Sequence, residues 1–260
     1  MERGGDTSVT HLKNTSNILD EFGYSSVLLV YHSKIDDNLI KAVRVLDLNH
    51  KFKYMPAIRT YSISPEYCAM ICKAFESISP NRLMLNIVSG DLHEDETSIN
   101  DMIWLGKDLD TPEKRLKYTD DWMKKFIELC GSSLPDIVMA GHSNETKLMA
   151  ESYNATHLGM LNMHKQSYSN NNFIKNTKQM LSLSVIINDS EDEIESMLSK
   201  NLGSHQWTIY GNKESVKKQI LELKGIGATD ILIGPHPEDK NVSSIHYMVR
   251  EMIGEQNGIK

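Results

Sequence analysis

Ionisable and small polar residues recur directly after short apolar segments of this chain. They are His32 and Ser33, Arg59 and Thr60, Ser89 to Asp91, Gly141 to Ser143, His164, and Gly234 to His236. Such side chains can move protons or hold polar ligands, and in β/α barrels the chemistry is carried by residues from several strand ends. The alternative is that these positions are ordinary polar loops. The pattern therefore indicates a candidate site whose parts must be brought together by the fold.

Common cofactor and nucleophile motifs are absent from the sequence. The nearest match to G-x-G-x-x-G covers residues 225–230, but it lacks the third glycine and precedes an expected strand. Residues 211–215 have the wrong glycine spacing for a phosphate loop, and we interpret them as the start of a helix. There is no H-E-x-x-H, C-x-x-C or G-x-S-x-G pattern.

The three cysteines do not form a disulfide framework, and an odd, low count suits a reducing compartment. Cys68 and Cys72 are spaced four residues apart and share one apolar helix face with Ile71 and Phe75. We therefore expect core packing, and no metal site, for these thiols.

Composition excludes several classes of protein. The chain has 260 residues and a formal net charge of −7, which argues against a nucleic-acid binder. No apolar run approaches the roughly 20 residues of a membrane span, and the N-terminal residues carry no apolar signal core. We expect a cytoplasmic protein that binds neither nucleic acid nor membrane.

Helix and strand patterns alternate along the chain. Helical spacing appears at 12–22 (ended by Gly23), 38–46, 114–129, 145–153, 216–223 and 242–252, and after Ser64 and Pro65, which are typical of a helix start. Strands are expected at 26–31, 52–58 (despite Pro56), 83–88, 136–140, 156–161, 181–187 and 230–233. A polar loop is expected over 91–112. This α/β alternation leaves two architectures, a doubly wound open sheet or a β/α barrel.

A family resemblance enters at residues 54–90. An Ala-x-Arg strand end, a Ser-Pro helix start, an Asn-Arg turn and an Asn-x-Val-Ser-Gly strand end follow in order; here they are Ala57 and Arg59, Ser64-Pro65, Asn81-Arg82, and Asn86 to Gly90. With the segments 114–122, 136–143 and 211–237, this order resembles the luciferase-like flavin-dependent monooxygenases, and most of all the alkanesulfonate monooxygenases.

The resemblance implies a single domain over residues 1–260, with a (β/α)8 TIM-barrel fold that binds reduced flavin mononucleotide (FMN) at its strand ends. The deazaflavin F420 is the less favoured cofactor. Ala57 would lie against the flavin ring, Asn86 and Ser89 would hydrogen-bond the ring system, and Tyr118 would stand near it. The catalytic candidates are His32 and Arg59, and the phosphate would be held by Gly141, His142 and Ser143.

The sequence also departs from the family pattern. The family barrel begins with a strand before its first helix, whereas residues 1–11 resemble only the loop after that strand. The family's long lid insertion is reduced to about two dozen residues between Ile187 and Gly211. A family tyrosine beside Arg115 is replaced by Leu116, and Ile35 falls near a family cysteine. We therefore expect an incomplete barrel.

Two functions follow from this comparison. The first is a flavin-dependent monooxygenase or oxidoreductase that acts on a small organic substrate with reduced flavin and O2. A separate flavin reductase would supply the reduced flavin. The second is a non-catalytic flavin-binding relative or partner subunit that has lost its lid. Because a barrel without its first strand leaves unpaired edges, we also expect a homodimer or a gap partly filled by residues 1–10.

Overall fold

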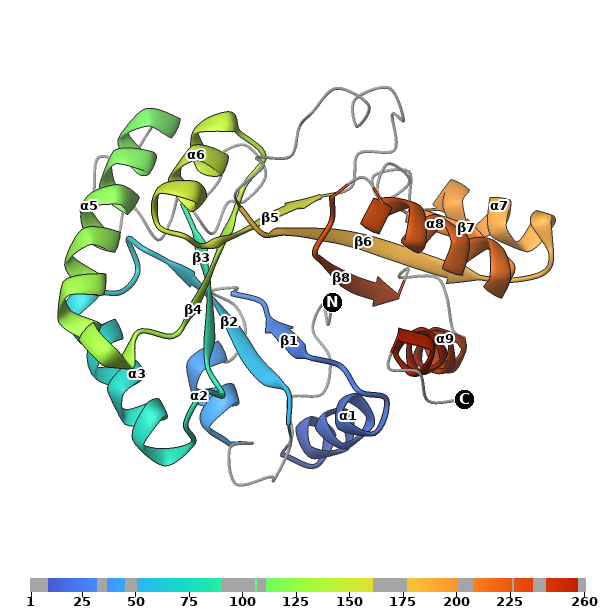
Figure 1. Cartoon of the computed structure of the whole chain (residues 1–260), viewed down its shortest axis with the longest axis horizontal. Coiled ribbons are helices and arrows are strands. Elements are labelled where there is room, and N and C mark those ends of the chain that lie inside the picture. Colours follow the sequence, from blue (N-terminus) through green and yellow to red (C-terminus); the bar gives the residue numbers. More distant parts are fainter. Residues whose placement is uncertain are drawn as a thin grey trace. The chain divides into compact units, whose positions relative to one another are not determined.

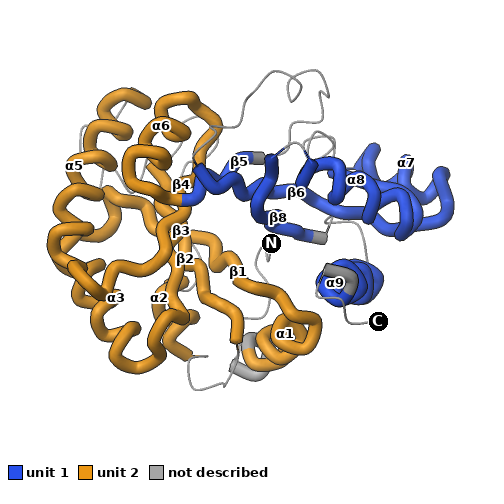
Figure 2. The backbone as a smooth tube through the Cα atoms, viewed as in Figure 1, with its two compact units in different colours: residues 1, 156–260 blue, residues 2–155 orange. Residues whose placement is uncertain are grey.

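The computed structural model describes residues 9–31, 37–44, 51–89, 106, 111–160, 177–200, 208–225, 227–235 and 242–256. The chain divides into two compact units, Glu2–Ala155 and Thr156–Lys260 (Figure 2). None of the helices that the structure describes combines the length and apolarity needed to cross a bilayer. The single domain expected over residues 1–260 stays a prediction.

The first unit alternates helices with four parallel strands in the order β1-β2-β3-β4 (Figure 1). Its elements are α1 (Val9–Glu21), β1 (Ser26–Leu29), α2 (Asn38–Arg44), β2 (Lys53–Arg59), α3 (Pro65–Ile78), β3 (Met84–Val88), α5 (Pro112–Cys130), the 3-10 turn η1 (Gly131–Ser133), β4 (Asp136–Ala140) and α6 (Asn144–Ser152). Among the described residues the first strand follows the first helix, as the sequence predicts.

The local signals for helix ends act as expected. Gly23 follows α1 with a φ of 77°, in the left-handed region that glycine adopts at low cost. The Ser64 hydroxyl accepts a hydrogen bond from the Tyr67 N–H, and Pro65 occupies the first turn of α3. Pro56 is accommodated inside β2, opposite Leu29, the last residue of β1.

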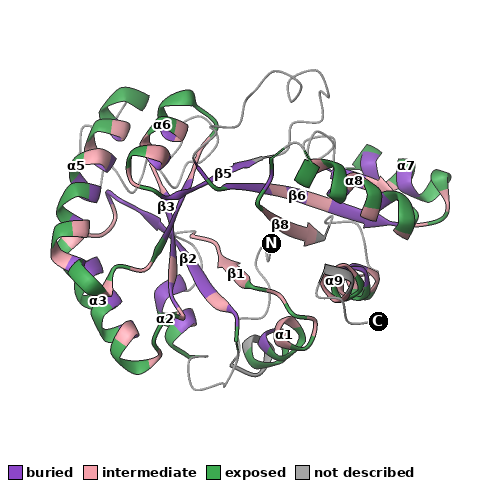
Figure 3. Cartoon of the chain, in the orientation of Figure 1, coloured by how far each residue is buried: buried purple, intermediate pink, exposed green. Residues whose placement is uncertain are grey.

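Strands β2, β3 and β4 consist mostly of buried residues (Figure 3), so both faces of this part of the sheet are covered. The two faces differ in chemistry. Toward the helices these strands present apolar side chains such as Ile58, Leu85 and Met139, which pack with Cys72 and Phe126 in one core cluster. Because side chains alternate along a strand, the intervening residues point to the opposite face. That second face carries Met55, Ala57, Arg59, Asn86 and Val138.

The second unit is built around the nine-residue strand β6. Its elements are β5 (Thr156–Met160), β6 (Gln179–Ile187), α7 (Glu191–Lys200), β7 (Thr208–Gly211), α8 (Lys213–Gly225), β8 (Asp230–Pro235) and α9 (Val242–Gln256). Met180 to Ser182 of β6 pair with both β5 and β8, and Ser184 and Val185 pair with both β7 and β8. Strands β5 and β7 therefore follow one another along one edge of β6, and β8 takes the other edge.

The prediction of seven strands missed β7 and the helix α7 that precedes it. Strand β7 has four residues, too few for an alternating pattern to be recognised from sequence. The interpretation of residues 211–215 as a helix start is confirmed, because α8 begins at Lys213 and the Asn212 side chain accepts from the Ser215 N–H. In α7, Ile194 and Leu198 pack on Ile186 of β6.

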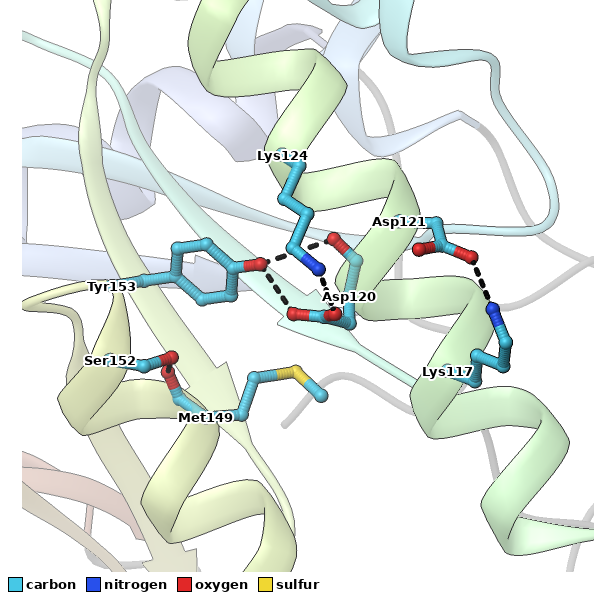
Figure 4. A network of polar contacts seen from close by, with 7 residues as sticks. All are labelled: Lys117, Asp120, Asp121, Lys124, Met149, Ser152 and Tyr153. Carbon is cyan, nitrogen blue, oxygen red and sulfur yellow. Dashed lines mark hydrogen bonds and ion pairs between the residues drawn. The ribbon is translucent and has the colours of Figure 1, made fainter.

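A polar network ties α5 to the end of α6 (Figure 4). The Tyr153 hydroxyl donates to the Asp120 carboxylate at 2.5 Å, and Lys124 approaches the other carboxylate oxygen at 2.6 Å. The hydrogen bonds from Lys124 and then from Tyr153 lower the pKa of Asp120 below its usual range. The tyrosine thus fixes the helix that follows β4 against its neighbour.

Replacing Tyr153 by Phe should lower the free energy of unfolding by about 1 kcal/mol, because a bond to a carboxylate is lost and that carboxylate is one-third exposed. A carboxyl group whose pKa is lowered by folding stabilises the folded state at pH values above its unfolded pKa. This stabilisation is lost as the pH falls through the pKa of the folded state. The difference in unfolding free energy between wild type and variant should stay constant from pH 6 to 8 and become smaller below about pH 4. Denaturant titrations measure it, with Tyr67→Phe on an exposed tyrosine as the matched control; a gap that widens in acid contradicts the assignment.

Candidate functional site

Ala57 and Asn86 lie side by side near the carboxyl ends of β2 and β3. They are register partners in the parallel sheet, and Asn86 is in turn paired with Val138 of β4. The next row toward the strand ends is Arg59, Val88 and Ala140. All of these side chains belong to the face opposite the helices, so two adjacent strands supply neighbouring parts of the site that the sequence predicts.

The Asn86 side chain carries an unsatisfied polar atom. The residue is 4% exposed, and its Oδ1 has no hydrogen-bond partner within the described part of the chain. A buried carbonyl oxygen without a donor costs about 1–3 kcal/mol. An oxygen placed at this cost beside the small side chain of Ala57 is suited to accept an N–H from a flat ligand.

Arg59 ends β2 and is held by an aromatic ring. It is 9% exposed, and its guanidinium lies 4.7 Å from the ring centroid of Tyr31, which follows β1. The contact is a cation–π interaction of the kind that arginine makes with tyrosine. Its backbone carbonyl accepts from both the N–H and the hydroxyl of Ser62. The Tyr31 ring and the hydrogen bonds of Ser62 to the Arg59 carbonyl therefore hold the positive charge of Arg59 at the end of β2.

Asn38, which the sequence analysis did not single out, joins two strands at the site. Its side-chain amide donates to the carbonyl of Ala57 at 2.6 Å and to that of Leu29 at 3.2 Å. Strand β1 stops at Leu29, so the asparagine side chain replaces a strand as the donor to Ala57. No clear signal in the sequence marks this role, because the burial that distinguishes Asn38 from a surface asparagine, 4% exposure, is visible only in the structure.

The segment Gly141, His142 and Ser143 connects β4 to α6. Ser143 caps the helix, since its Oγ accepts the Thr146 N–H at 3.1 Å and lies 3.2 Å from the Thr146 hydroxyl. A Cβ at Gly141 would lie 2.8 Å from Thr146 Oγ1, so the threonine side chain requires glycine there. His142 is exposed beside them. Helix capping and close packing thus account for Ser143 and Gly141 without a ligand. The start of α6 is exposed and lies beyond the carboxyl end of β4.

Ser89 and Tyr118 occupy different surroundings. Ser89 follows β3, is partly buried, and lies close to Thr119 and Thr146 on the helix side of the sheet. Tyr118 on α5 packs against the core cluster between helices and sheet. Thr119, next to it, pairs its hydroxyl with that of Thr60 at 3.0 Å in the interior. The structure thus assembles Ala57, Asn86 and Arg59 on one face, whereas Tyr118 belongs to the helix-side layer.

Several predicted residues lie outside the described part of the chain. These are His32, Ser33, Ile35, Gly90, Asp91, His164, His236 and residues 1–8.

The expectation that Cys68 and Cys72 pack in the core is confirmed, and Cys130 is buried in the same cluster. Cys68, Cys72 and Cys130 are free thiols, and each is at most 2% exposed. The hydrogen bond with Cys72 and burial raise the pKa of the Cys130 thiol, so it stays protonated at neutral pH. Over the described ranges, no group of three or more His, Cys, Asp or Glu residues is placed to hold a metal ion.

Comparison with known proteins gives a likeness of fold. No protein-family model matches the sequence. The EDTA monooxygenase EmoA from Chelativorans sp. BNC1 aligns with a TM-score of 0.75 at 10% identity, over 96% of this chain and 87% of that one. The riboflavin lyase RcaE, solved with modified FMN and the substrate riboflavin, gives 0.75 at 12% identity over 97% and 85%. An F420-dependent secondary alcohol dehydrogenase, in complex with an F420–acetone adduct, gives 0.68 at 12% identity over 92% and 93%.

These likenesses select between the two architectures that the sequence left open. The matched structures are β/α barrels and cover nearly the whole chain, so the fold class is α/β of the TIM-barrel type, as the resemblance implied. Arg59, Val88 and Ala140 end their strands at the carboxyl side of the sheet, which is the side that carries the chemistry in folds of this type.

Replacing Gly141 by Ala should destabilise the protein by about 1–3 kcal/mol, because the new methyl group meets the Thr146 side chain at 2.8 Å. In a Thr146→Ala background, which removes the nearest atoms, the same change should cost less than half as much. Thermal or denaturant unfolding of the four proteins in this double-mutant cycle measures the coupling. Equal costs in the two backgrounds would show that Thr146 is not the reason for the glycine.

Proposed function

We propose that this chain is a flavin-dependent oxidoreductase of the luciferase-like type, a monooxygenase that acts on a small organic substrate with reduced FMN and O2. The observation that carries the proposal is the buried Asn86 Oδ1, which has no partner in the described residues and lies on the register partner of Ala57. The fold is shared with a monooxygenase and with proteins solved with modified FMN or an F420 adduct.

The residues present fit a flavin ring. Ala57 is small enough for a flat ring to lie close to the strand, and Asn86 Oδ1 would accept a ring N–H. Ser89 would contact the cofactor beyond the end of β3, since its neighbours Ile87 and Met139 lie on the helix side. When bound, reduced flavin would supply the two electrons that activate O2 for oxidation of the substrate, while the protein would orient and shield the cofactor. F420 remains the second cofactor candidate, since it presents a similar ring system.

The phosphate group of the cofactor would bind at the start of α6. Backbone N–H groups at a helix N-terminus favour anions. The Ser143 oxygen is used as the helix cap, but its hydroxyl hydrogen can be donated to a phosphate oxygen. Gly141 and His142 would complete this binding site.

The remaining proposed roles concern the substrate side. Arg59 would face an anionic group of substrate or cofactor, and His32 would move protons. A cofactor-binding role for Tyr118 has less support, because this residue packs against the helix-side core cluster. A separate flavin reductase would supply reduced flavin, and a homodimer would be the assembly.

The alternative, a non-catalytic flavin-binding or partner-subunit relative, is favoured by one observation. The stretch between β6 and α8 holds α7 and the short strand β7, with little chain left for a substrate lid. A lid excludes water from reactive intermediates. Substrate turnover in the presence of a flavin reductase would remove this alternative.

Replacing Asn86 by Leu tests the ring assignment. The substitution removes a buried polar atom that lacks a partner, so the protein without cofactor should gain about 1 kcal/mol or more in unfolding free energy. Reduced FMN should bind about tenfold more weakly, because a ring N–H loses its acceptor. Denaturant melts and flavin titrations measure the two effects. A variant that loses stability without cofactor would mean that Oδ1 is satisfied by the protein itself.

Replacing Ser143 by Ala tests the phosphate assignment. The loss of the cap should cost about 1 kcal/mol of stability. If the hydroxyl also donates to phosphate, FMN should bind roughly tenfold more weakly, whereas riboflavin, which has no phosphate, should be little affected. Titrations of both flavins against wild type and variant separate the roles. Equal losses for FMN and riboflavin would reduce Ser143 to a helix cap.

A further inference from the structure

A cavity lies on the helix side of β2, away from the face that carries Ala57 and Asn86. It has a volume of about 530 Å³, within the range of small-molecule sites. Ile58 of β2 and Leu39 of α2, which are 3% and 7% exposed, form its buried wall. Ile40 of α2 and Tyr67 of α3, each 58% exposed, stand at its rim. The cavity therefore reaches from the helix surface down to the sheet.

Most polar side chains that line the cavity are engaged in the fold. The Asn38 amide donates to the strand carbonyls of Leu29 and Ala57. The Ser62 hydroxyl donates to the Arg59 carbonyl, and the Ser64 hydroxyl caps α3. These groups offer little to a ligand, and what they leave is an aliphatic and aromatic surface.

Asp37 is the exception. Its Oδ1 accepts the Ile40 N–H at 2.9 Å, so one carboxylate oxygen is used at the start of α2. The residue is exposed, and its negative charge is the one formal charge among the described residues that line the cavity. The rings of Tyr31 and Tyr67 lie on the same cavity. A carboxylate with aromatic rings attracts a positive group on an apolar body.

We infer that this cavity binds a small organic amine, a molecule with an apolar body that contacts the isoleucines and tyrosines and a cationic end that faces Asp37. The site stands apart from the proposed flavin function, because β2 separates it from the Asn86 face. Three described lining residues of the cavity also contact the part of β2 that carries the Asn86 face. The Tyr31 ring holds the Arg59 guanidinium, and Ser62 binds the backbone carbonyl of Arg59. Asn38 binds the backbone carbonyl of Ala57.

Three probes that share a phenylalkyl body and differ in charge test the site without flavin: phenylethylamine, phenylethanol and phenylpropionate. Calorimetric or ligand-detected NMR titrations of the full chain should show that the amine binds most tightly, then the alcohol, then the carboxylate. The amine should bind about threefold more tightly than the alcohol. Asp37→Asn keeps an oxygen that can cap α2 but removes the charge. In that variant the amine should bind no better than the alcohol, and the alcohol should be unaffected.

Matched pairs of exposed apolar residues on the same two helices locate the binding. The double variant Ile40→Ser and Tyr67→Ser, at the cavity rim, should weaken all three probes at least fivefold. The double variant Val43→Ser and Met70→Ser removes residues that are 44% and 65% exposed on α2 and α3 but do not line the cavity, and it should change nothing. FMN titrations of the same proteins should be unaltered, so a failure of the amine site and a failure of flavin binding are read separately.

Two results would overturn the inference. One is an absence of probe binding, or tighter binding of the carboxylate than of the amine. The other is a wild-type dimer, seen by light scattering, that both double variants dissociate. That result would assign this helix face to a second copy of the chain.

Discussion

The geometry of the candidate site depends on strands that are buried on both faces. In β2, β3 and β4 the alternation of side chains sends one set of residues to the helix-side core and the next set to the opposite face. Parallel register then aligns Ala57 with Asn86 and Arg59 with Val88. A slip of one residue would exchange the two sets and place Asn86 in the apolar core. The core cluster is therefore what fixes the position of the polar residues.

Most elements and the α/β class followed from the sequence because their signals are local or periodic. The choice of a barrel came from the family resemblance and the likeness of fold. Ser64-Pro65 and Gly23 mark helix ends through capping and backbone conformation. The short apolar segments predict buried parallel strands. Strand β7 was missed because its pairing to Ser184–Ile187 of β6 is a tertiary contact, and its four residues, TIYG, lack the continuous apolar run that marked the equally short β1.

The site was predictable in its residue types more than in its contacts. The family resemblance proposed Ala57, Asn86 and Arg59 as site residues, and the register places these three candidates together on one face. It gave no sign that Tyr31 would hold Arg59 or that Asn38 would bind the Ala57 carbonyl. Both contacts join residues that are distant in the chain, so no local pattern encodes them. Tyr118 shows the converse, because a residue near a family position packs in the helix-side layer.

The arrangement around β6 has a consequence for the order in which the second unit folds. The start of β6 is bonded to the start of β8 across 50 residues, through Gln179 and Thr229. Closing so long a loop is slow, and contacts of large sequence separation form late. During synthesis β6 would therefore expose one edge until β8 has left the ribosome. In that interval the long apolar strand is the segment of this unit most open to wrong pairing and to chaperone binding.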